Sequence, residues 1–207
     1  MTSYDISELV KEVKVLLDRN STNQALIEDG DVETLQQDEL IKPRIVEAVR
    51  LIELHAPIHM LGDATVRSQP DASAYTFQEP ILRLLGVRGS GWGRMPKMIT
   101  PEDEEYSWQH SPYGVKGNNE RPLYAVIEEG GNVQLEFFPP TNVSIMYLPI
   151  PSENNGKVEI CKACKDAVLY AAASLVSGAM GDSNGASAFL SMAYGMVGLQ
   201  TRQTDNN

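Results

Sequence analysis

The stretch LYAVIEEGGNVQLEFFPPTNVSIMYL, residues 123–148, decides the fold class of this chain. It contains three runs that are rich in β-branched and aromatic residues, a composition typical of strands. A Gly-Gly pair separates the first two runs and a Pro-Pro pair separates the last two, and both pairs favour turns. The stretch therefore predicts an antiparallel meander with strands at 123–127, 133–138 and 143–148.

Helical periodicity is present on both sides of this stretch. Apolar residues recur at steps of three and four from Ile6 to Leu17, and similar spacing returns in three later segments. Pro43 predicts a kink or a new start in the second of these segments, and Pro57 predicts its end. The predicted helices are residues 6–17, 33–56, 157–177 and 186–199, with a polar connection at 20–31.

Two further segments precede the meander. Residues 62–93 contain short apolar runs divided by prolines and glycines, which predicts short strands and loops. Residues 94–122 hold four prolines, an acidic cluster at 102–105 and several aromatic residues, without periodicity. This second pattern predicts an extended surface loop, and its aromatic residues favour a loop that docks on a partner.

Together these elements predict an α+β chain. The helices from both ends are expected to pack as a helical bundle, because each has an apolar stripe that must be buried. The antiparallel β-meander and the long loop form an insertion between them. The expected domains are N-terminal bundle helices at 1–61, a β-rich insertion with the extended loop at 62–151, and C-terminal bundle helices with a polar tail at 152–207.

Composition and charge exclude several classes of protein. The 207 residues are 42% hydrophobic, which is sufficient for a core. No apolar run approaches the roughly 20 residues that cross a bilayer, and residues 1–5 lack the pattern of a secretory signal. The formal net charge of -11 opposes broad electrostatic binding to DNA, but an acidic surface suits a channel through which DNA slides. We expect a cytosolic product that neither enters a membrane nor grips nucleic acid.

Two motifs have the residue types of metal or redox sites without the required context. Cys161 and Cys164 have the spacing of half a zinc site or of a redox pair, but the chain has no second such pair and both lie in a predicted helix. The acidic segment 28–31 lacks the spaced ligands of a calcium loop. These motifs predict partly buried cysteines and a solvated acidic turn.

Two other motifs are also incomplete. His55, His59 and Asp63 are spaced by four residues, but Pro57 interrupts the helix that would align them. The sequence GSGWG at 89–93 lacks the Lys-Ser/Thr of a phosphate-binding loop and the order of a hydrolase elbow, so it predicts a bent β-connection anchored by a Trp. The sequence therefore predicts no catalytic, cofactor-binding or metal-binding residue.

The order of these features resembles that of the head-to-tail adaptor, or connector, proteins of tailed bacteriophages. Members of that family have a strand, a Gly-rich turn, a strand ending in Pro-Pro, a strand ending near Tyr, and then two helices. The helix at 47–61 is similar to the one that precedes the family's insertion, and 87–96 is similar to ring proteins of crAss-like, podovirus-type phages. The matching segments are 124–128, 130–132, 133–140, 143–147 and 164–199.

The resemblance implies a non-enzymatic structural subunit of the virion. It implies a homo-oligomeric ring of twelve copies that docks below the portal protein and surrounds the DNA channel, in the neck of a particle assembled in the host cytoplasm. It further implies contacts with other tail or ring proteins, no cofactor, and double-stranded DNA that passes during ejection without specific binding. The long acidic-aromatic loop and the small-residue last helix depart from the family pattern.

Aromatic side chains dominate interface energies, so the expected anchors of subunit or partner contacts are Trp92, Tyr106, Trp108 and Tyr113. Two other functions remain open from the sequence. One is a monomeric regulatory or protein-binding module whose β-insertion binds a peptide or another protein. The other is an enzyme that depends on a metal held by His55, His59 or the cysteine pair.

Overall fold

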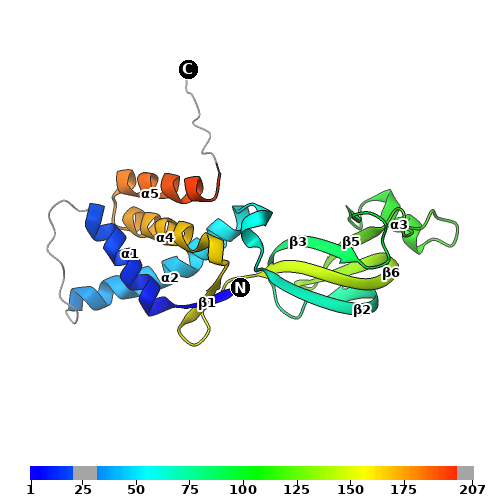
Figure 1. Ribbon diagram of the computed structural model, residues 1–207, viewed down its shortest axis with the longest axis horizontal. Helices are drawn as coiled ribbons and strands as arrows, with labels where there is room; N and C mark the ends of the chain where they lie inside the picture. Colours follow the sequence, from blue (N-terminus) through cyan, green and yellow to red (C-terminus); the bar gives the residue numbers. More distant parts are fainter. Residues whose placement is uncertain (21–31, 200–207) are drawn as a thin grey trace, which may run out of the picture. The chain divides into compact units, whose positions relative to one another are not determined.

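The computed structural model describes residues 1–20 and 32–199, and the protein is of the α+β class (Figure 1). The chain divides into two compact units. Unit 1 is built from both ends of the chain, Met1–Asp63 and the part from Pro151 onward, and unit 2 is Ala64–Ile150. Residues 21–31 lie outside the described residues. They include the predicted acidic turn at 28–31 and all of the predicted connection at 20–31 except its first residue.

Unit 1 contains the long helices. They are α1 (Ile6–Asn20), α2 (Val32–His55), α4 (Lys165–Ala179) and α5 (Ser183–Met196). The first two confirm the predicted helices at 6–17 and 33–56, and Pro43 lies inside α2. The start of α1 is capped, because the Asp5 carboxylate accepts a hydrogen bond from the Ser7 backbone N–H at 2.8 Å.

The helix α4 occupies the middle of unit 1. It packs against α5 on one side and against α1 and α2 on the other (Figure 1). Small side chains permit this close packing, since Ala167, Ala171 and Ala172 are fully or almost fully buried. An ion pair of 2.8 Å between Lys165 and Glu12 also connects α4 to α1.

The predicted start of the third helix, at residue 157, is wrong. Lys157–Ile160 forms strand β7, which pairs antiparallel with β1 (Thr2–Asp5), and η2 (Lys162–Cys164) follows before α4 begins. Buried Val158 and Ile160 alternate with exposed residues, which is the period of a strand. The local sequence favours a helix here because Ile160 is also in helical phase with Cys164, and it contains no signal of the pairing with β1.

Unit 2 is a mixed sheet around one long strand. Strand β6 (Asn132–Pro149) pairs antiparallel with β2 (Thr65–Thr76), β3 (Ile81–Gly89) and β5 (Leu123–Glu129). Strand β4 (Lys97–Ile99) is parallel to β5. The core on one side of this sheet consists of Ala72, Phe77, Val87, Leu135, Phe137, Val143, Ile145 and Tyr147.

The turn predicted at 139–142 is wrong, because β6 continues through both prolines. The pairing of β6 with β5 ends at Phe138, and its pairing with β3 begins at Val143. On the opposite edge the pairing of β6 with β2 is also interrupted, between Glu136 and Thr141. Successive N–H groups of a strand point to opposite edges, and neither edge pairs residues 139 and 140, so both prolines are tolerated. The expected second and third strands are therefore one strand that changes its neighbour.

The extended loop predicted at 94–122 is also wrong in part. The segment contains β4 and the helix α3 (Glu104–His110). A helix of 7 residues is too short to show a clear apolar period, which explains why the sequence pattern did not reveal it. Among the described residues, no helix has the length and hydropathy that crossing a membrane requires.

Candidate partner interface

Exposed apolar side chains are frequent in the segment 94–122 of unit 2. Tyr113 is 97% exposed, Val115 is 76% exposed and Trp108 is 42% exposed. Met95 and Met98 are exposed in the same segment. Since exposed apolar side chains that gather on one surface mark many binding sites, this segment is the candidate interface.

The helix α3 has two anchored faces and one free face. On the face toward the sheet, the Tyr106 hydroxyl donates to the Glu136 carboxylate at 3.3 Å, and His110 Nε2 lies 3.3 Å from the same oxygen. On a second face, Gln109 is buried against the chain that returns after the helix. Trp108 is left on the exposed face.

Ring packing supports the anchoring of α3 on β6. The Tyr106 and His110 rings have centroids 4.7 Å apart, and the His110 ring meets the Phe138 ring edge-on at 5.7 Å. Burial, and then the nearby Glu136 carboxylate, raise the pKa of Tyr106 above its ordinary value. Tyr106 therefore stays a neutral hydrogen-bond donor at physiological pH.

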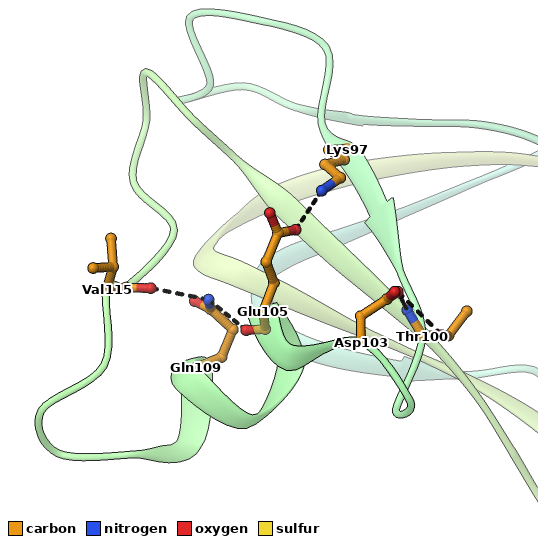
Figure 2. Close-up of polar contacts among 6 residues, drawn as sticks. All are labelled: Lys97, Thr100, Asp103, Glu105, Gln109 and Val115. Atoms are coloured by element: carbon orange, nitrogen blue, oxygen red, sulfur yellow. Dashed lines mark hydrogen bonds and ion pairs between the residues drawn. The ribbon is translucent and has the colours of Figure 1, made fainter.

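Gln109 holds the turn that follows α3 (Figure 2). Its side-chain Nε2 donates to the backbone carbonyls of Glu105 at 3.0 Å and Val115 at 3.2 Å, and its Oε1 accepts from the Gly117 N–H at 2.7 Å. Lys116 Nζ also donates to the Gln109 carbonyl. One buried amide thus joins the helix to both ends of the Val115–Gly117 segment, and we call residues 104–117 the α3 loop.

Two glycines allow the α3 loop to approach the backbone of α3 and the backbone of β6 closely. A Cβ at Gly114 would lie 2.1 Å from the Trp108 carbonyl oxygen, and a Cβ at Gly117 would lie 2.6 Å from the Phe138 carbonyl oxygen. Both neighbours are backbone atoms that have little freedom to move. The loop conformation therefore requires glycine at both positions.

A polar turn positions the start of α3 (Figure 2). The Asp103 carboxylate accepts from the Thr100 N–H at 2.7 Å and from the Thr100 hydroxyl at 3.1 Å. These hydrogen bonds from Thr100 lower the pKa of Asp103, because they stabilise its charged form. At the surface, Lys97 on β4 pairs with Glu105 at 2.5 Å.

The four predicted interface aromatics lie in two different environments. Trp92 is half-buried against the core of unit 2, and its indole N–H donates to the Pro139 carbonyl at 3.2 Å. Tyr106 faces Glu136, as described above. Trp108 and Tyr113 belong to the α3 loop, and they are the two predicted residues whose side chains are exposed.

Several residues of the interface were not singled out from the sequence. Gln109 has no sequence signal, because one Gln in a polar segment is ordinary. Val115, Met95 and Met98 carry a weak signal, as large apolar residues within a turn-rich segment. Their number, in a segment whose conformation the Gln109 hydrogen bonds support, is what identifies the candidate surface.

The cysteine pair lies in unit 1, away from any exposed surface. Cys161 and Cys164 are both buried and unlinked. Burial raises the pKa of Cys164 to about 12, and burial together with the nearby Glu53 raises the pKa of Cys161 further. Both thiols are therefore neutral and weakly nucleophilic.

The histidines of the His55–His59–Asp63 spacing do not converge on a common site. The His55 ring Nδ1–H donates to the Leu51 carbonyl at 2.9 Å, and His59 is exposed in η1 (Ile58–Leu61). Within residues 1–20 and 32–199, no group of three or more His, Cys, Asp or Glu side chains is placed to hold a metal ion.

No protein-family model matches the chain. No curated protein matches it significantly. Function is therefore inferred from the residues, from their geometry and from the resemblance given above.

Proposed function

We propose that this chain is a non-catalytic structural subunit of a head-to-tail connector ring in a tailed bacteriophage. The observation that carries the proposal is the exposure of Trp108, Tyr113 and Val115 on the α3 loop, whose conformation Gln109 supports by hydrogen bonds. Aromatic anchors dominate interface energies, and a loop already held in shape by Gln109 loses little conformational freedom when it binds.

In this proposal the two units have different tasks. The helices α1, α2, α4 and α5 act as the N- and C-terminal helical bundle that forms the body of the subunit, and α4 at its centre supports this role. Unit 2 is the β-rich insertion, which carries the α3 loop toward a neighbouring subunit, the portal or another tail protein. A contact between unlike surfaces of neighbouring copies is the kind that closes a ring.

The charge of the chain supports a position around DNA. With a net charge of -11, the subunit repels the phosphate backbone, so double-stranded DNA passes a ring of such subunits without being held. We propose twelve copies per ring, placed below the portal in the neck of the virion. A channel lined by Lys and Arg would contradict this part of the proposal.

The first experiment tests the docking role of the α3 loop. The purified chain, its Trp108→Ala/Tyr113→Ala variant and the control Val66→Thr, an exposed apolar position on β2, are each mixed with the portal protein of the same particle. We expect the double variant to keep the wild-type circular dichroism spectrum and to bind at least about 30-fold more weakly, the effect of losing about 2 kcal/mol at a hot spot. The control should bind like wild type.

Two results would contradict this proposal. Unchanged binding by a folded double variant would remove the α3 loop from the interface. Binding of a partner in a one-to-one complex, with no ring, would favour a regulatory protein-binding module instead. Electron microscopy of the intact particle gives the independent test, since the proposal requires density for this chain between portal and tail.

A further inference from the structure

Unit 1 contains a buried carboxyl group that none of the functions above uses. Glu53 lies on α2 and its residue is 0% exposed. Its Oε1 accepts the Cys161 backbone N–H at 2.6 Å. Its other oxygen, Oε2, is buried and has no hydrogen-bond partner among the described residues. A charged carboxylate with half of its oxygens unpartnered is costly to bury.

The charged groups around Glu53 do not compensate for this burial. The Asp63 carboxylate, which accepts the Lys162 backbone N–H at 3.0 Å, opposes a negative charge on Glu53. The Cys161 and Cys164 thiols on the facing segment carry no charge, and the Cys161 thiol lowers the pKa of Glu53 by less than burial raises it. The N-terminal ammonium of Met1, which donates to the Asp63 carbonyl, favours the charge but ranks last among the contributions.

We propose that Glu53 is a proton-binding site that fastens the last turns of α2 to the Cys161–Cys164 segment when it is protonated and loosens this junction when it is ionised. The neutral carboxyl keeps its acceptor for the Cys161 N–H without placing a charge in the core. Ionisation leaves Oε2 as a buried charge beside Asp63, and local opening relieves it by admitting water.

Glu53 changes its protonation state near the pH of the cytoplasm. Burial, as the largest cause, raises its pKa to about 7 from an ordinary 4.5, although hydrogen bonds from the Cys161 backbone N–H and the Cys161 thiol lower it. A carboxyl that binds its proton more tightly in the folded state stabilises that state at low pH. Its contribution is complete below about pH 4.5, falls as the pH rises, and is lost above about pH 7.

The test compares the pH dependence of unfolding in three proteins. They are the full chain, Glu53→Gln, and the control Glu39→Gln, which neutralises an exposed carboxyl on the same helix. Between pH 5 and pH 8 we expect the unfolding constant of the wild type to rise by up to ~10²-fold more than that of Glu53→Gln. Glu39→Gln should follow the wild type. Parallel curves for all three proteins would overturn the proposal.

A second measurement covers the case in which Glu53→Gln does not fold. Carbon-detected NMR of the wild-type side-chain carboxyls follows Glu53 directly. We expect one Glu signal to titrate well above the others, near pH 7, and the protection of the Cys161 amide against hydrogen exchange, measured relative to its intrinsic rate, to fall above that pH. Titration of every Glu signal near its ordinary value would overturn the proposal.

Discussion

Gln109 in unit 2 and Glu53 in unit 1 are both buried polar side chains on helices, and each joins its helix to a segment that follows later in the chain. Gln109 has hydrogen-bond partners for its oxygen and for both protons of its amide. Glu53 has a partner for one oxygen and none for the other among the described residues. The amide makes the same contacts at every pH, whereas the carboxyl changes its charge.

The chain therefore contains two kinds of hydrogen-bonded contact between a helix and a later segment. A neutral amide whose partners are all present gives a contact that does not respond to the surroundings, which suits a loop that must present aromatic side chains in a fixed shape. A carboxyl with a missing partner gives a contact that depends on a proton. The expected effects below test whether this distinction is correct.

The largest effect is expected when Gln109 is given the chemistry of Glu53. In Gln109→Glu a carboxylate oxygen faces the Glu105 and Val115 carbonyls, which it cannot bond as a donor. We expect the free energy of unfolding to fall by roughly 3 kcal/mol at pH 8. The loss should be smaller at pH 5, because burial raises the folded-state pKa of the new carboxyl and its protonated form regains a donor.

Denaturation followed by tryptophan fluorescence measures this change, since both tryptophans, Trp92 and Trp108, lie in unit 2. The matched control is Gln78→Glu, which introduces the same charge at an exposed position of that unit. An equal loss of stability at pH 5 and pH 8 would show that the protonation state of the new carboxyl does not determine the loss. The proposed difference between Gln109 and Glu53 would then be wrong.

The next effect concerns the space that the α3 loop requires. In Gly114→Ala the new Cβ overlaps the Trp108 carbonyl oxygen, so the loop must move away from the helix. We expect a loss of about 2 kcal/mol and faster hydrogen exchange in residues 104–117, measured by mass spectrometry. Gly86→Ala is the control, because its Cβ has open space. Unchanged exchange in Gly114→Ala would mean that the loop is not held in this shape.

A smaller effect is expected at the contact between α3 and the sheet. Glu136→Gln removes the charge that accepts from Tyr106 and lies near His110, but it keeps one acceptor oxygen. We expect thermal stability to fall by about 1 kcal/mol, compared with no change for Glu128→Gln at the exposed end of β5. Unchanged stability of Glu136→Gln would mean that the Gln109 hydrogen bonds are the main interactions that hold the loop.

The fold class could be predicted from the sequence, because strong local patterns carry it. The apolar spacing of α1 and α2 and the Gly130-Gly131 turn between β5 and β6 are signals that neighbouring residues create themselves. The course of β6 through Pro139 could not be predicted, because it depends on which strands lie beside it. The same is true of β7, whose strand conformation depends on β1, far away in the chain.

The candidate site could be predicted only in its chemistry. The aromatic residues of the segment indicated a docking loop, but the sequence could not show that Trp108 and Tyr113 are the ones that face solvent. That depends on Gln109, whose partners at 115 and 117 are set by tertiary geometry. Trp92 illustrates the converse, since Gly89 lets its ring lie over the backbone and against the core.

The smallest effect is expected at the exposed ion pair between Lys97 and Glu105. Lys97 and Glu105 lie 2.5 Å apart, but their side chains are 63% and 37% exposed, so water and salt screen the attraction. We expect Lys97→Gln to change the free energy of unfolding by less than about 0.5 kcal/mol and to leave hydrogen exchange in the α3 loop unchanged, in low salt and in high salt. A loss above about 1 kcal/mol that disappears in high salt would mean that surface charge, and not the buried amide of Gln109, holds the loop, because only an exposed ion pair responds to salt in this way.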